Sequence, residues 1–365
     1  MPSRLTYFIG WQRGVGQISP KLKAQDTRSA RLRTKKISVY NRSGEHDDEM
    51  NVILPWKPDE SCPCGNNMLL KDCCLGSDGV PRIKLPSLVP TGPLTGHSNE
   101  NCYLKSTLNC STKTNKEHYI SRSLLQQLGE PLRWAGLPWE KPGVEIRYGP
   151  NSLSSHILCD RHNSALSPLD QLASNAFKAI RASSDELNVR SLARRKKWFL
   201  ISGEALELWA LKTICGLFYA SVAARNRQSL NKAYSIDVSR FEKAVCQGYV
   251  DAPCGLYVTP NTGQRNPLVY APLSVEQDKR VIGIRIGLAA LEFDVILDPT
   301  GVNFDYLNRN FFYRPWLINM SSQRRMHTMV LSWPNSPLGS RIVNVRLMPT
   351  KAKSQQAKRS SIAIP

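Results

Sequence analysis

The chain has 365 residues, enough for two or three domains that each bury a core, and 41% of them are hydrophobic. Its formal net charge of +20 predicts an anionic partner, most commonly nucleic acid, with a generally basic surface as the alternative. The most apolar stretch, 205–224, carries Glu207 and Lys212, so we interpret it as a buried amphipathic helix and not as a membrane span.

The ten cysteines point to metal binding if the compartment is reducing. The first residues lack an apolar segment followed by a small-residue cleavage site, so we expect a cytoplasmic location. In a reducing compartment, clustered Cys and His favour metal ligands over disulfides. Cys215 lies in the apolar helix and is expected in the core.

Residues 1–55 form a basic N-terminal arm. Arginines and lysines alternate with small polar residues over 22–36, and a short acidic run follows at 45–49. This pattern predicts a flexible segment. Contact with nucleic-acid phosphates and a merely solvated arm both remain open.

The segment 56–80 contains four cysteines with the spacing C-x-C-x₈-C-C: Cys62, Cys64, Cys73 and Cys74. Four thiolates this close together can surround one tetrahedral Zn²⁺, which would supply the folding energy of so small a unit. The stretch resembles the SEC-C zinc motif, although its middle, 66–70, departs from the usual lysine-rich composition. A closed four-thiolate site is structural or docks a protein partner, and it leaves no open position for catalysis.

A proline-rich linker over 81–97 leads to a second group of ligand residues within 98–175. Cys102 and Cys110 lie in one loop at the start of this segment. Cys159 and His162 lie later in it, with the C-x₂-H spacing of a zinc knuckle. The spacings predict a second structural zinc shared by the two pairs. Two buried thiols beside a surface histidine are the alternative.

Glu117 and His118 lie between these two pairs, in NKEHYISRSLL (115–125), and LCDRHNSALSPLD (158–170) follows. The order C…C…EHxIS…LCxxHN…LSxLD resembles the HNH, or ββα-metal, endonucleases, in particular the modules of bacterial genome-defence proteins. The resemblance implies a hairpin and a following helix tied together by zinc, with the acidic-His pair at the end of the first strand. It covers about residues 98–175.

The resemblance also implies roles for individual residues. His118 matches the general base, which takes a proton from the attacking water. Glu117 and Asn163 match the ligands of a catalytic divalent ion, and their oxygen atoms suit Mg²⁺ or Mn²⁺. The family more often has Asp in place of Glu117 and His in place of Asn163; both residues here keep an oxygen ligand.

Three further residues complete the predicted site. Asn151 is the candidate for the asparagine that orients the catalytic histidine, although His156 lies closer to the strand that enters the knuckle. Arg122 is placed to contact a phosphate. After the knuckle, Ser167, Pro168 and Asp170 predict the start of a helix, with a capping serine, a first-turn proline and an acid three residues on.

Residues 176–350 predict a helical and then β-rich C-terminal domain. Apolar residues recur at helical spacing over 175–187, 191–200 and 203–226, and short alternating runs follow after about 250. Four adjacent cations at Arg194, Arg195, Lys196 and Lys197 either track a nucleic-acid backbone or form a solvated helix face. The tail, 351–365, is basic and expected to be disordered.

These patterns together predict an α+β protein in which a small zinc-bound ββα-metal module is joined to an N-terminal zinc knob, a helical segment and a β-rich C-terminal part. The implied function is metal-dependent hydrolysis of phosphodiester bonds in nucleic acid, expected to be DNA. The alternative is a zinc-stabilised nucleic-acid-binding or adaptor protein without catalysis.

Overall fold

The structure is a computed structural model that describes residues 54–128, 132–134, 146–149, 152–189, 196–225, 228–259, 266–323 and 325–347. Several predictions lie outside these ranges: nearly all of the N-terminal arm, Asn151, Arg194, Arg195 and the tail. Within them the chain is a mixed α+β fold, as expected.

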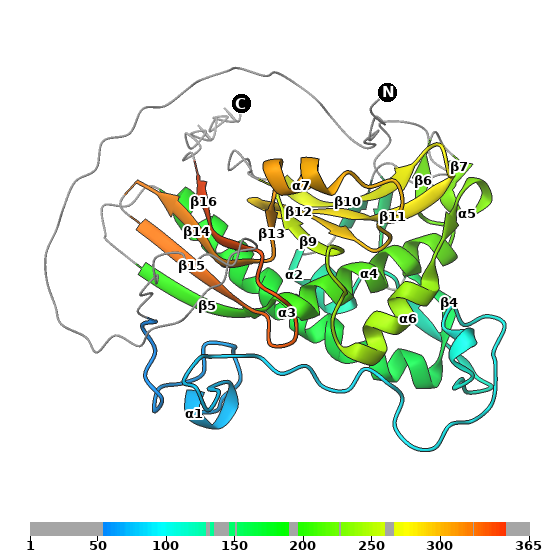
Figure 1. The fold of residues 1–365 in the computed structure, drawn as a ribbon, viewed down its shortest axis with the longest axis horizontal. Coiled ribbons are helices and arrows are strands. Elements are labelled where there is room, and N and C mark those ends of the chain that lie inside the picture. Colours follow the sequence, from blue (N-terminus) through cyan, green and yellow to red (C-terminus); the bar gives the residue numbers. More distant parts are fainter. Residues whose placement is uncertain are drawn as a thin grey trace, which may run out of the picture.

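Two helices, α3 and α4, run beneath the two larger sheets (Figure 1). The helices are α1 (Leu70–Cys73), α2 (Arg122–Leu128), α3 (Asp160–Asn188), α4 (Gly203–Tyr219), α5 (Leu230–Ala233), α6 (Val238–Gln247) and α7 (Phe304–Asn310), with a 3₁₀ turn at Lys105–Thr107. The segment that contains α1 and is expected to bind zinc lies at one end of the molecule, and the segment after it runs below α3 towards β4.

The larger sheet has the strand order β10-β11-β12-β9-β13, with β8 paired to β11. Its strands are β8 (Ser235–Ile236), β9 (Gly255–Val258), β10 (Asn266–Val275), β11 (Arg280–Ala289), β12 (Leu291–Ile296) and β13 (Phe312–Tyr313). The pairing is antiparallel apart from that of β8 with β11.

A second sheet has the order β16-β14-β15-β5. It consists of β5 (Lys196–Ser202), β14 (Pro315–Ser322), β15 (Arg325–Ser332) and β16 (Ser340–Arg346). The remaining strands form three pairs: β1 (Thr114–His118) with β4 (Ser154–Cys159), β2 (Leu132–Trp134) with β3 (Ile146–Tyr148), and β6 (Ala224–Arg225) with β7 (Gln228–Ser229). The strands that follow residue 250 confirm the β-rich C-terminal part.

Helix α3 forms because a buried stripe recurs every three or four residues along it. Leu166, Leu169, Ala173 and Ile180 are among its buried side chains. The stripe continues past residue 175, so the boundary predicted between 175 and 176 falls inside this helix.

The helix start predicted at Ser167 is wrong, because α3 already begins at Asp160 and contains Pro168 in its interior. Pro168 has no backbone N–H and leaves the carbonyl of Ser164 without its usual helical donor. The hydroxyl of Ser167 donates to that carbonyl at 2.9 Å. The serine therefore repairs an interior gap in the helix, where the sequence suggested a cap.

Helix α4 is buried on every side from Gly203 to Phe218, which confirms the expected burial but not the expected amphipathic character. Ser202 caps it by accepting a hydrogen bond from the backbone N–H of Ala205 at 3.1 Å. The charged residues of α4 are buried with partners from other elements. Each of these pairs ties α4 to a different part of the fold.

The fully buried pair Glu207–Arg314 joins α4 to the loop before β14. Arg314 Nε lies 2.7 Å from Glu207 Oε1, and Arg314 Nη2 lies 3.0 Å from Glu207 Oε2. Arg314 also donates to the carbonyl of Val250 at 2.6 Å, and Glu207 Oε1 accepts from the backbone N–H of Leu256 at 2.7 Å. This bidentate geometry pairs the two buried charges, while Nη1 of Arg314 has no hydrogen-bond partner among the described residues.

Replacing Arg314 by methionine is expected to lower the free energy of unfolding by about 3–5 kcal/mol, because Glu207 is left buried and unpaired. The double variant R314M/E207M removes both charges and should recover most of that loss. Urea unfolding followed by circular dichroism measures both variants. Equal destabilisation of the single and double variants would show that the pair does not act as a unit.

The helix predicted over 191–200 is also wrong, because residues 196–202 form strand β5, which pairs in parallel with β15. Its side chains alternate between two cores. Leu200 packs in the cluster of the zinc knob, whereas Ile201 packs in the main core. A strand buried on both faces has a continuous apolar run, and such a run does not distinguish strand from helix.

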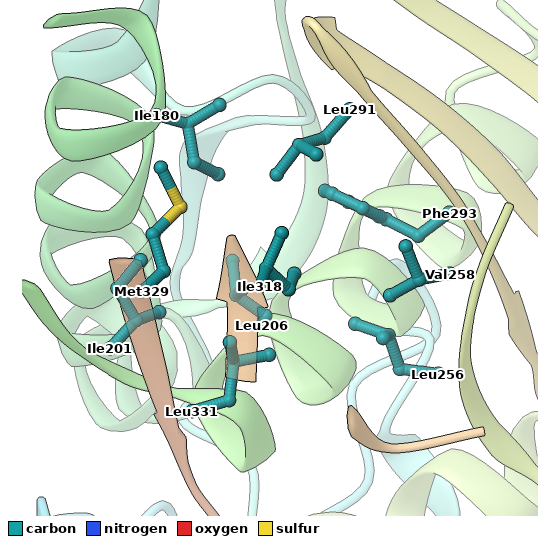
Figure 2. A pocket seen from close by; sticks show the side chains of 10 residues that line it. All are labelled: Ile180, Ile201, Leu206, Leu256, Val258, Leu291, Phe293, Ile318, Met329 and Leu331. Atoms are coloured by element: carbon teal, nitrogen blue, oxygen red, sulfur yellow. The ribbon is translucent and has the colours of Figure 1, made fainter. Parts of the chain in front are cut away.

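The two sheets and the helices meet around a small apolar cavity (Figure 2). Its volume is about 10 Å³. The lining side chains are all apolar: Ile180, Ile201, Leu206, Leu256, Val258, Leu291, Phe293, Ile318, Met329 and Leu331. A void this small and without polar partners is a packing gap in the core and not a ligand site.

The predicted linker, 81–97, packs against the body of the protein. Ile83 is buried, and its backbone N–H donates to the Ser332 hydroxyl of β15 at 2.9 Å. Leu88 joins the main core, which extends without interruption from this residue to Leu347. The predicted nuclease module and the C-terminal part therefore share one hydrophobic core.

Candidate active site and zinc centres

The second group of ligand residues is built on a hairpin and a helix. Strand β1 pairs antiparallel with β4, so that Glu117 lies opposite Ser155 and His118 lies opposite Ser154. A bulge between Asn115 and Glu117 interrupts the register just before this pair. Helix α3 then begins directly after β4. The order of elements is strand, strand, helix, with α2 and the β2–β3 pair inserted between the two strands.

Four buried ligand atoms converge where this hairpin meets the helix. Cys102, Cys110, Cys159 and His162 place their sulfur and nitrogen atoms within 4.8 Å of one another. His162 Nδ1 lies 3.5, 3.7 and 3.2 Å from the sulfurs of Cys102, Cys110 and Cys159. Ligands of a tetrahedral zinc lie roughly 3.6–3.8 Å apart, so these residues fit a zinc ion.

A hydroxyl group fixes the orientation of the histidine in this cluster. Thr107 Oγ1 lies 3.0 Å from His162 Nε2, the ring nitrogen that faces away from the sulfurs. Such a partner selects the tautomer in which Nδ1 is free to bind a metal. Sequence reasoning missed Thr107, because only its position in the 3₁₀ turn after Cys102 brings it to the ring.

The first cysteine group also converges in the structure. The sulfurs of Cys62, Cys64, Cys73 and Cys74 lie within 4.8 Å of one another, and Cys73 Sγ lies 3.6 Å from the sulfurs of both Cys64 and Cys74. These distances match the edges of a four-thiolate zinc tetrahedron. Hydrogen bonding from neighbouring thiols, chiefly Cys74, lowers the pKa of Cys64 to about 5, which favours the thiolate that a metal requires.

The zinc knob, defined here as residues 61–75, is docked against the β16-β14-β15-β5 sheet. Leu70 and Ile83 pack in one buried cluster with side chains of three strands: Leu200, Trp316, Leu317 and Val330. Met68 and Leu69 on the knob remain partly exposed. The knob therefore covers one face of this sheet within the same chain.

Replacing Cys73 by serine is expected to remove one of two zinc ions and to lower the melting temperature by several degrees, because the knob loses the metal that orders it and uncovers the sheet. Zinc content by atomic emission and a thermal melt measure both effects. Cys246, exposed and outside both clusters, provides the matched control C246S. A melting temperature equal to that of the control would contradict a stabilising role for the knob.

A polar groove of about 450 Å³ opens beside the hairpin. It is lined by residues of β1, α2 and α3: Lys116, Glu117, His118, Arg122, Ser123, Gln126, Asn163, Ser167, Asp170 and Gln171. The structure thus brings four residues that the sequence singled out, Glu117, His118, Asn163 and Arg122, to one groove.

His118 is half-buried in this groove, and its Nε2 has no hydrogen-bond partner among the described residues. Burial, and then the positive charge of Arg122, lower the pKa of the imidazole. The ring is therefore neutral at pH 7, which is the form that can accept a proton.

Glu117 is buried and paired with a lysine that sequence reasoning did not connect to it. Lys212 Nζ, from α4, lies 2.6 Å from Glu117 Oε1 and 2.6 Å from Asp170 Oδ2. Burial raises the pKa of Glu117, while the charge of Lys212 acts in the opposite direction. Burial works to lower the pKa of Lys212, but Asp170 and Glu117 outweigh it and the pKa is raised. The ammonium is charged at neutral pH.

Other predicted residues lie away from the groove or outside the described residues. His156 is exposed on β4, with Nδ1 3.2 Å from Thr114 Oγ1. Lys196 and Lys197 are exposed at the start of β5, where Lys197 pairs with Glu186 at 2.6 Å, and neither lines the groove. Asn151, Arg194 and Arg195 are outside the described ranges.

Within the residues that the structure describes, only the two Cys and Cys/His clusters gather three or more Cys, His, Asp or Glu ligand atoms. In the same ranges, no helix combines the length and the apolar character needed to cross a bilayer. Comparison of the chain with protein-family models, with curated proteins and with solved structures found no match.

Proposed function

We propose that the protein is a metal-dependent endonuclease of the HNH type that hydrolyses phosphodiester bonds in DNA. One observation carries the proposal: a strand–strand–helix unit brings His118 and Asn163 to the same groove as Arg122, next to a cluster of three cysteines and a histidine that could hold zinc. Zinc at that cluster would hold the 3₁₀ turn, β4 and the start of α3 in a fixed relation to one another.

In the proposed reaction, His118 is the general base. His118 lines the groove, and its buried Nε2 has no hydrogen-bond partner among the described residues. Once water reaches this atom, the neutral ring could take a proton from the water molecule that attacks the phosphorus. Arg122, exposed at the start of α2, and Lys116 would bind the flanking phosphates. The positive charge of Arg122 has two effects: it attracts the phosphate of the substrate, and it lowers the pKa of His118 so that the imidazole stays neutral.

The residues that would hold a catalytic divalent ion are Glu117 and Asn163, a carboxylate and an amide that line the same groove. Their hard oxygen ligands suit Mg²⁺ or Mn²⁺. When bound, such an ion would stabilise the negative charge on the scissile phosphate and on the leaving oxygen.

The test is cleavage of supercoiled plasmid and of single-stranded DNA by the purified protein with Mg²⁺ or Mn²⁺, with an EDTA-treated sample and a matched RNA substrate alongside. We expect metal-dependent conversion of the plasmid to nicked or linear forms. Intact plasmid and intact single strands with both metals would reject the enzyme. Cleavage of RNA alone would keep the chemistry and change the substrate.

The second candidate is a zinc-stabilised nucleic-acid-binding or adaptor protein, and the ion pair between Lys212 and Glu117 favours it. A carboxylate that is already neutralised by an internal ammonium attracts a divalent ion less strongly. This candidate predicts a DNA mobility shift with no cleavage in either metal. The net charge of +20 supports binding in both cases.

Further parts of the proposal concern location and partners. Ten free cysteines, seven of them in the two clusters, suit a reducing cytoplasm. Met68 and Leu69, exposed on the zinc knob, would supply the apolar contacts for a protein partner. Genome defence is the role that we assign to the nuclease on the strength of the motif order alone.

A further inference from the structure

Lys212 lies at a point where two carboxylates of the groove converge. Its ammonium is 2.6 Å from Glu117 Oε1 of β1 and 2.6 Å from Asp170 Oδ2 of α3. Only 4% of the Lys212 side chain is exposed, and both acids line the groove. Two carboxylate oxygens from separate elements that meet at one position can bind a cation. Here the Lys212 ammonium occupies that position.

The position of this cation is fixed by a chain of contacts. Asp170 accepts a hydrogen bond from the Ser121 hydroxyl through its other oxygen, and the indole N–H of Trp209 donates to that hydroxyl at 2.7 Å. Trp209 and Lys212 are three residues apart on α4 and so share one helix face. The ammonium therefore cannot move away without disturbing three elements.

The charge balance explains why a cation is needed there. Two unpaired carboxylates beside each other repel, and a buried carboxylate without a partner tends to take up a proton. They would also repel a phosphate that approaches the groove. A fixed ammonium between them removes both effects.

We infer that Lys212 is a built-in cation and the positioning residue of Glu117: it holds the position that a second divalent ion would otherwise take between Glu117 and Asp170, so that the groove takes a single ion. The consequence for cleavage rests on the proposed function, whereas the occupancy of this position does not. Lys212 is not among the residues that line the groove, so it acts through Glu117.

The test measures Mn²⁺ binding by electron paramagnetic resonance on zinc-loaded protein without nucleic acid. Lys212→Met frees both carboxylates, so we expect the affinity for Mn²⁺ to rise by about tenfold or more, because carboxylate count sets the affinity of oxygen-ligand sites. The gain should disappear in the double variants K212M/E117Q and K212M/D170N. Lys116→Met, which removes the same charge from the groove without freeing a carboxylate pair, should leave the affinity within about twofold.

A K212M protein that folds, by circular dichroism and zinc content, and binds Mn²⁺ no better than wild type would overturn the inference. An equal gain in the Lys116 variant would do so too, because it would indicate a general effect of charge. Lys212→Gln, which keeps an N–H donor, is measured in the same way if the methionine variant does not fold.

If neither variant folds, nuclear magnetic resonance of the Lys212 ammonium group in the wild-type protein provides the test. We expect its signal to persist at Mg²⁺ concentrations that saturate the protein, and its loss would mean that the metal displaces the lysine. A failed plasmid assay with raised Mn²⁺ affinity in K212M would reject the nuclease and keep the built-in cation. Plasmid cleavage by the wild-type protein, with no rise in Mn²⁺ affinity in K212M, would keep the nuclease and reject the built-in cation.

Discussion

His118→Ala is expected to lower the rate of plasmid cleavage by about 100-fold or more and to leave the affinity for DNA unchanged. Loss of a general base typically removes a factor of about 10²–10⁴. Alanine removes the ring nitrogen Nε2, which has no hydrogen-bond partner among the described residues, and leaves Arg122, the proposed phosphate contact, in place. Single-turnover cleavage and a mobility shift at constant salt measure the two quantities.

His156 provides the control for this variant. It lies on the strand paired with β1, is exposed, and has its Nδ1 3.2 Å from Thr114 Oγ1, away from the residues that line the groove. H156A should cleave at close to the wild-type rate. Equal losses in H118A and H156A would point to damage to the hairpin instead of lost chemistry, and full activity in H118A would remove the histidine from the mechanism.

Cys159→Ser is expected to release the zinc of the second cluster and to unfold the hairpin. Structural zinc sites contribute about 10–16 kcal/mol of binding free energy in small zinc modules. Cys159 also ends β4 and immediately precedes α3, so loss of the metal removes the link between the end of the hairpin and the start of the helix. Zinc content should fall from two ions to one, and the groove should lose its Mn²⁺ binding.

C246S is again the matched control, because this exposed thiol belongs to neither cluster. Removal of zinc from the wild-type protein by 1,10-phenanthroline should reproduce the unfolding expected for C159S. Retention of two zinc ions by C159S, with an unchanged thermal melt, would show that the cluster does not hold the metal.

Local spacing was sufficient to predict the two clusters that could hold a metal ion and part of the groove. Eight residues of the two clusters follow from Cys and His spacing, because ligands of a small zinc site lie on short loops whose reach is limited. The burial of α4 followed from its length and apolar composition. The meeting of His118 and Asn163 followed from motif order, and their catalytic roles stay predictions.

The parts that failed depend on contacts distant in sequence. Strand β5 exists because β15, more than a hundred residues later, pairs with it and because its two faces meet different cores. Asp170 looked like a helix-capping acid, and nothing local indicated that its partner is Lys212. An ion pair formed between three separate elements has no signature in one sequence.

Helix α3 determines how the chain can be divided. Its 29 residues span about 44 Å at 1.5 Å per residue, from Asp160, next to the candidate zinc ligand His162, to a C-terminal end whose carbonyls are bound by Arg325 of β15. A fragment cut at residue 175 would stop partway along this helix and lose both Arg325 and Lys212. The segment with the HNH-like motif is therefore not expected to fold alone, because its helix is held in place by residues from the rest of the protein.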